Sequence, residues 1–194
     1  MTADLAPAAT RLSGLLRTVP DDLLDAPTPC PGYTLAALFD HVDGVTRAFT
    51  AAARKTPLEE APAGDPARLG PDWRERIPAQ LAEMAASWDD PRAWEGMTRA
   101  GGLDLPADVA GLVALDELVV HGWDVARAAG LPYAAEPAEI EACRSLLTPG
   151  DDEPERTGDP FGPPVPAPPD ASELDRLIAL AGRDPRWEGS TGGR

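Results

Sequence analysis

Long apolar runs and cysteine are both scarce in this sequence of 194 residues. No apolar run approaches the roughly 20 residues that a membrane-spanning helix needs. The N-terminus also lacks the basic segment, followed by an apolar one, that marks a secretory signal peptide. The two cysteines, Cys30 and Cys143, are too few for a disulfide scaffold and fit a reducing compartment. These absences predict a soluble, cytoplasmic protein.

Basic residues are scarce relative to acidic ones. The chain has 17 Lys and Arg residues against 33 Asp and Glu residues, which gives a formal net charge of −16 at pH 7. Such an acidic surface repels phosphate backbones and anionic lipid, so we expect neither nucleic acid nor membrane as a partner. Hydrophobic residues make up 43% of the chain, enough for the core of one domain. Nothing in the sequence specifies an oligomeric state.

Apolar residues recur at the 3.6-residue period of an α-helix, and no segment shows the alternation typical of a strand. The period predicts helices near residues 5–20, 34–54, 72–88, 106–129, 137–147 and 172–181. Thr34 is a suitable N-cap, and Gly101 with Gly102 is expected to form a turn. Residues 56–71 hold several prolines and form a long connection. The pattern predicts an all-α fold, an antiparallel four-helix bundle with a long crossover and short extra helices at the C-terminus.

The expected domain organisation follows the composition. Residues 1–150 contain the long helical patterns and are expected to form the bundle. Residues 151–194 begin with a Pro-rich stretch, which lacks any period, and contain one short helical pattern. We expect this part to be an arm whose helix packs on the bundle.

The stretch "DELVVHGWD" places Glu117 and His121 four residues apart in an otherwise apolar helix. Residues at this spacing lie on one face, one turn apart, and Asp124 extends the same line. A helix that is apolar nearly all round is buried, and a buried carboxylate is costly unless it is paired or bound to a metal. The stretch therefore contains candidate metal ligands.

His41 is in a similar setting on the second long helix, beside Leu38 and Val42, with Asp40 and Asp43 expected on the solvent side. Two imidazoles and one carboxylate are enough to hold a divalent metal and to leave positions open for water or substrate. His41, Glu117 and His121 are the predicted ligands. Asp124 is a candidate to accept a hydrogen bond from a ligand imidazole or from a water.

The same pattern has plainer explanations. With 33 acidic residues in 194, about one histidine in six has an acidic residue four positions before it. A surface Glu–His pair, or a core histidine bonded to a backbone carbonyl, would look the same. Cys30 lies between two prolines with no cation nearby in sequence, which favours a packing role. Glu139 and Glu141 are expected on a solvated face.

Three segments carry a family resemblance: "PTPCPGYTLAALFDHV", "ALDELVVHGWDVARAAG" and "FGPPVPAPPDASELDRLIALAGRDPRW". Together they resemble the DinB-like metal-binding proteins related to the N-terminal domain of mycothiol-dependent maleylpyruvate isomerase. The resemblance implies a DinB-like four-helix bundle and a divalent metal, usually zinc, held at His41, Glu117 and His121. It also implies mycothiol as a cosubstrate whose sulfur occupies the open metal position.

The sequence departs from the family pattern in two places. Tyr33 follows "CPG" where the motif usually has Trp. The tail after Gly150 is Pro-rich and then contains one helical pattern, whereas the isomerase carries an additional C-terminal α/β domain. The bundle is therefore implied more firmly than the isomerisation.

Three functions remain open from the sequence. The first is a thiol transferase or isomerase that uses a metal-bound thiolate, a small-molecule thiol and an electrophilic substrate. The second is a metal-dependent hydrolase with metal-bound water, and the third is a metal-binding module without turnover. Nitrogen and oxygen ligands accept Zn²⁺, Ni²⁺ and other divalent ions, so the metal is also left open.

Overall fold

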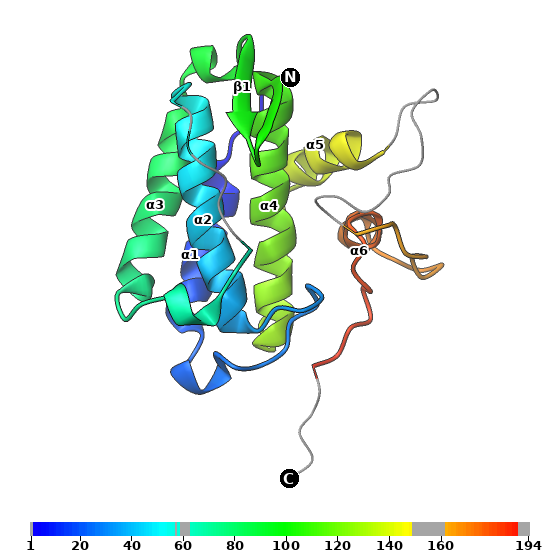
Figure 1. Cartoon of the computed structure of the whole chain (residues 1–194). Coiled ribbons are helices and arrows are strands. Elements are labelled where there is room, and N and C mark those ends of the chain that lie inside the picture. The colour runs from blue at the N-terminus through cyan, green and yellow to red at the C-terminus, as the bar shows by residue number, and fades with distance from the viewer. Residues whose placement is uncertain (1, 57, 59–62, 149–161, 190–194) are drawn as a thin grey trace.

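The computed structural model describes residues 2–56, 58, 63–148 and 162–189. In this part of the chain most residues are helical, as the sequence predicts (Figure 1). None of the described helices is both long and apolar enough to cross a membrane. The elements are α1 (Ala6–Thr18), η1 (Asp21–Leu23), α2 (Leu35–Ala53), η2 (Pro66–Arg68), α3 (Trp73–Trp88), η3 (Pro91–Trp94), β1 (Met97–Ala100), β2 (Leu103–Pro106), α4 (Ala107–Ala128), α5 (Pro137–Leu147) and α6 (Glu173–Leu180).

Helices α1 to α4 form the bundle, in which α1 and α2 each pack against both α3 and α4. The crossover after α2 returns to the end of the bundle where α2 begins. There Asp40 accepts a hydrogen bond from the Asp65 backbone N–H at 2.9 Å and pairs with Arg68 at 2.6 Å. As a result, α3 starts at that end and runs in the same direction as α2. Large side chains from all four helices fill the core, among them Leu16, Phe39, Leu81 and Leu115.

Local signals account for the helix boundaries. The side chain of Thr34 accepts a hydrogen bond from the Ala37 backbone N–H at 3.3 Å, and Ser172 caps α6 through Asp175 at 3.1 Å. Each predicted helix agrees with the observed one to within about two residues. Pro78 lies inside α3, which begins at Trp73.

The sequence pattern, which shows no strand, misses a short hairpin after α3. Strands β1 and β2 form an antiparallel hairpin whose last pair joins Ala100 and Leu103. Gly101 and Gly102 form its turn with φ values of 56° and 78°, a conformation that favours glycine. The strands escape detection because each has four residues and little buried surface; Leu103 is 70% exposed.

Two carboxylates expected on the solvent side of α2 are buried instead. Asp40 and Asp43 are each 8% exposed, and Asp43 pairs with Arg76 of α3. The expectation of a solvated Glu139 is also wrong, because Glu139 is 4% exposed and pairs with Arg11 of α1. In each case an arginine from another element compensates the charge, which the local pattern does not reveal.

The C-terminal residues extend the bundle on the side of α4. Helix α5 packs on α4, and α6 packs on α5. Beyond α6, the carbonyl of Pro185 accepts a hydrogen bond from Arg127, and Arg183 reaches Asp124 at 3.4 Å. The Pro-rich stretch of the predicted arm, residues 151–194, is described only from residue 162 on, where residues 162–170 form neither helix nor strand; residues 151–161 lie outside the described residues.

A glycine pair tests the packing of α4. A β-carbon at Gly111 would lie 2.4 Å from the ring of Trp94, and that ring is fixed because its N–H donates to the Trp88 carbonyl at 2.8 Å. We expect Gly111→Ala to lower the free energy of unfolding by about 1–3 kcal/mol, as measured by urea denaturation. Gly14→Ala in α1 is the control, since no atom lies within 4 Å of its β-carbon, and it should stabilise the protein by about 0.5–1 kcal/mol. Equal stabilities for the two variants would contradict the packing argument.

Candidate metal centre

The structure brings His41, Glu117 and His121 together between α2 and α4. His41 lies 76 residues before Glu117, and its Nε2 is 3.3 Å from Glu117 Oε2. Nε2 of His121 is 3.0 Å from the same oxygen. The two imidazole rings meet edge to face, with centroids 4.9 Å apart at 86°. Two ring nitrogens therefore converge on one carboxylate oxygen.

Helices α2 and α4 position the three side chains. Glu117 and His121 are one turn apart on the inner face of α4, and His41 faces them from α2. The side chains of Glu117 and His121 are 8% and 4% exposed, whereas that of His41 is 25% exposed. The cluster is therefore buried on the α4 side and borders the surface at His41.

Charge compensation sets the protonation of the cluster. Burial acts to raise the pKa of Glu117, but hydrogen bonds from His121 and His41 outweigh burial and hold the pKa well below its usual range. Burial acts to lower the pKa of His121, but its contacts with Asp124 and Glu117 outweigh burial and raise the pKa to about 9. In the metal-free protein near neutral pH, the glutamate is therefore ionised and His121 carries a proton on each nitrogen.

The second nitrogen of His121 faces Asp124. Nδ1 of His121 is 3.0 Å from Asp124 Oδ2, the contact expected from the spacing of the two residues. The guanidinium of Arg183 lies 3.4 Å from the same oxygen and also donates to Cys30 Sγ at 3.3 Å. Asp124 thus connects the cluster to the C-terminal part of the chain.

Cys30, His121 and Asp124 form a second group whose donor atoms lie within 4.8 Å of one another. Arg183 already supplies a positive charge there. Burial raises the pKa of Cys30 to about 12, and the opposing effect of Arg183 is smaller, so the thiol stays protonated at neutral pH. This group fits a cation less well than the first. The expectation that no cation lies near Cys30 is wrong, because the guanidinium of Arg183 contacts its Sγ. The sequence does not reveal this contact, since the two residues are 153 positions apart.

Tyr33 is a further neighbour of the cluster that the sequence does not single out as functional. Its ring stacks on that of His41 with centroids 5.7 Å apart at 23°. Its hydroxyl accepts a hydrogen bond from the Gly64 backbone N–H at 3.2 Å. The ring that covers His41 is thereby attached to the crossover.

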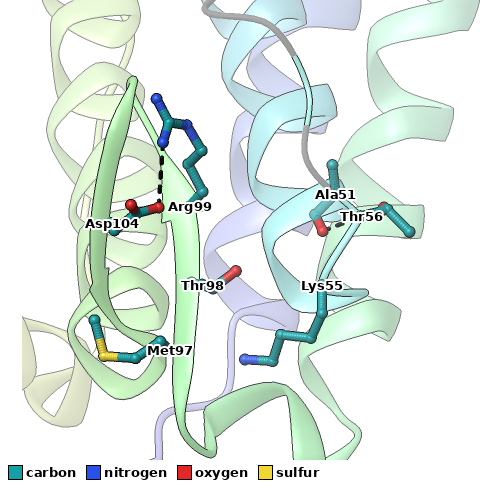
Figure 2. Close-up of a pocket in the computed structure, with 7 residues that line it drawn as sticks. All are labelled: Ala51, Lys55, Thr56, Met97, Thr98, Arg99 and Asp104. Carbon is teal, nitrogen blue, oxygen red and sulfur yellow. Dashed lines mark hydrogen bonds and ion pairs between the residues drawn. The ribbon is translucent and has the colours of Figure 1, made fainter.

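A separate cavity lies at the other end of α2. Figure 2 shows it between the hairpin and the end of the helix. Its volume is about 720 Å³. Lys55 and Arg99 line it, but Lys55 donates to the Ala93 carbonyl at 2.8 Å and Arg99 pairs with Asp104 at 3.3 Å. Since Lys55 is 14 residues after His41, the cavity is about 20 Å from the cluster along the helix axis. It contributes no group to the cluster.

The donor set of the first group suits a divalent metal. Its three residues offer two imidazole nitrogens and a carboxylate oxygen within 4.8 Å of one another. Ligand atoms that lie about 2.0–2.1 Å from a tetrahedral zinc ion are about 3.3 Å apart, close to the observed separations of 3.0 and 3.3 Å. Three such ligands leave one position for another molecule.

Fold and site together define a helical bundle with two histidines and a glutamate on the facing sides of α2 and α4. The chain belongs to the family of the mycothiol maleylpyruvate isomerase N-terminal domain, whose model matches residues 5–126. The matched segment contains the three clustered residues, whereas Arg183 lies outside it.

Two curated proteins and two solved structures are similar to this chain. Uncharacterised proteins from two strains of Mycobacterium tuberculosis are each 30% identical over 187 residues, covering 92% of this chain and 95% of theirs. The crystal structure of the mycothiol-dependent maleylpyruvate isomerase has a TM-score of 0.60 at 17% identity, covering 74% of this chain and 66% of that one. A histidine-to-alanine mutant of that isomerase gives a TM-score of 0.59 at 17% identity, with the same coverage of each chain. At this identity the structural likeness shows the fold alone.

The pKa of His121 predicts how stability depends on pH without metal. Its pKa of about 9 lies above the value of about 6.5 expected in the unfolded chain. Because His121 binds its proton more tightly in the folded state, protonation stabilises that state. This contribution is fully present below about pH 6.5 and is lost as the pH rises through about 9. We therefore expect the free energy of unfolding in EDTA to fall between pH 6.5 and pH 9 more steeply for the parent than for His121→Gln. The free energy is measured by urea denaturation at each pH. An equal fall in the two proteins would show that the pKa of His121 is not raised.

Proposed function

We propose that this chain binds a divalent metal through His41, Glu117 and His121 and uses it to activate a small-molecule thiol for reaction with an electrophile. The observation that carries the proposal is the convergence of two imidazole Nε2 atoms on one carboxylate oxygen, at 3.0 and 3.3 Å. A divalent cation among these groups would replace the protons that the metal-free cluster holds. Zinc suits the set best, and nickel and other borderline ions are accepted by the same donors.

The metal, when bound, stabilises the thiolate form of a thiol at neutral pH and so supplies a nucleophile. The chain's own residues hold and orient this chemistry. Glu117 brings the negative charge, and His41 leaves the cluster open on its partly exposed side. The ring of Tyr33 stacks on that of His41.

Mycothiol is the thiol we propose, because the family and the solved structures of similar fold carry its name. The structural match covers 66% of the isomerase chain, so the proposal extends to thiol transfer or isomerisation of an electrophilic substrate and not to maleylpyruvate itself. Both cysteines of this chain are free, in keeping with the reducing cytoplasm in which we place the reaction.

The metal ligands can be tested directly. We expect the parent to bind about one zinc ion per chain after zinc loading and dialysis, measured by mass spectrometry. His41→Ala and Glu117→Ala should each weaken zinc affinity by more than about 100-fold, since losing even a hydrogen-bond partner of a ligand costs about 10- to 100-fold. Glu141→Gln is the matched control, because the Glu141 side chain is 60% exposed, and it should bind zinc as the parent does. Undiminished binding by His41→Ala would show that the ligand assignment is wrong.

The role of the thiol needs a separate measurement. We expect the zinc-loaded parent to consume model electrophiles faster with mycothiol than without it, and to show no such acceleration in Glu117→Ala. The reason is that only the metal-bound protein stabilises the thiolate. Turnover that is independent of thiol would instead indicate a hydrolase that uses metal-bound water. Zinc binding without turnover under either condition would indicate a binding module.

A further inference from the structure

Arg183 is a buried arginine whose charge needs an explanation. It lies beyond α6 and is 4% exposed, among the most buried arginines of the described part of the chain. Burying a guanidinium is costly unless it is paired and hydrogen-bonded. Its partners include Asp124 at 3.4 Å, Cys30 Sγ at 3.3 Å and the Ala181 carbonyl at 3.0 Å.

The partner with an opposite charge is Asp124, which is 0% exposed. Oδ2 of Asp124 is the atom that faces both Arg183 and Nδ1 of His121. Arg183 and His121 therefore hold one carboxylate oxygen from two sides. Of the two charged groups that contact Asp124 Oδ2 in the described residues, removing Arg183 would leave the imidazole of His121. The carboxylate of Asp124 would then be less fixed in orientation.

The contact at Nδ1 matters for the other nitrogen of the same ring. When a metal replaces the proton at Nε2, a carboxylate acceptor at Nδ1 keeps the remaining proton there and fixes the plane of the ring. Nε2 of His121 is the atom that lies 3.0 Å from Glu117 in the cluster. A connected path thus runs from Arg183 through Asp124 and His121 to the proposed metal position.

We propose that Arg183 is a positioning residue for the metal centre: it holds Asp124 against His121 and thereby aims Nε2 at the metal. This inference rests on the proposed function and deepens it. The residues after α6 become part of the site, although they lie outside the segment that the family model matches. Arg183 also supplies a positive charge to the Cys30 group, which therefore fits a cation less well than the first group.

The test compares zinc affinity, by competition with a chromophoric chelator, in four proteins: the parent, Arg183→Gln, Asp124→Asn and the double variant. We expect each single change to weaken zinc binding by about 10- to 100-fold. The double variant should be no weaker than Asp124→Asn alone, because both changes act through the same bond. Arg127→Gln is the control, since Arg127 binds the nearby Pro185 carbonyl and touches neither Asp124 nor His121 in the described contacts; its affinity should equal that of the parent.

A second measurement reports the geometry itself. In the zinc-loaded parent the Nδ1 proton of His121 should give a downfield NMR resonance, and assignment is simple because the chain has two histidines. Arg183→Gln should move this resonance upfield, and Arg127→Gln should not. If Arg183→Gln fails to fold, Arg183→Lys takes its place, since it keeps the charge but loses the planar fork; the same direction of change is expected.

The outcomes separate the two proposals. If the Arg183 variants bind zinc like the parent with an unmoved resonance, while His41→Ala loses zinc, the positioning role is wrong and the metal centre stands. If the double variant shows the product of the two single effects, Arg183 acts independently of Asp124 and the inference is also overturned. If the parent itself binds no zinc, the proposed function fails and the positioning role fails with it.

Discussion

The buried carboxylate of Glu117 is the constraint on which this end of the bundle depends. A negative charge inside a helical core is destabilising unless opposite charges or hydrogen-bond donors surround it. Here two imidazoles perform that task, one from the same helix and one from α2. The contact between His41 and Glu117 is possible because the packing of α2 against α4 places the two residues level with each other. Charge compensation therefore depends on helix packing.

The same rule organises the segments around the bundle. Asp40 and Asp43 on α2 are compensated by Arg68 of the crossover and Arg76 of α3. Asp124 on α4 is compensated by Arg183 of the C-terminal residues. A buried ion pair adds little net stability over an apolar pair, but breaking one leaves a charge uncompensated. These pairs thus select where the crossover and the C-terminal residues dock more than they strengthen the core.

The sequence predicts the features that depend on near neighbours. Helix boundaries follow from period and capping residues such as Thr34, and the joint placement of Glu117 and His121 follows from the helix repeat. That His41 would face them follows less directly, from its apolar neighbours together with a family resemblance. The three side chains do converge. That they hold a metal is our proposal.

The remaining features have no local signal. The hairpin is too short for its alternation to be recognised. The arginines that pair with the buried carboxylates of Asp43 and Glu139 come from other helices. Arg183 is the clearest case, because it meets Cys30 across 153 residues and its neighbours in sequence resemble an ordinary helix end. A pairing of this kind is decided by the closed fold, in which each buried carboxylate takes the cation that its position allows.

Compensation also makes the cluster asymmetric. On the Nδ1 side of His121, Asp124 and Arg183 close the site with buried partners. On the other side, His41 is 25% exposed and is flanked by Tyr33, whose hydroxyl is bound by the crossover at Gly64. The neighbours of the cluster on the His41 side thus come from the loop before α2 and from the crossover, not from the inner faces of the helices. For the proposed function, selectivity for a thiol or an electrophile would reside in these irregular segments, whereas the helices hold the three clustered side chains.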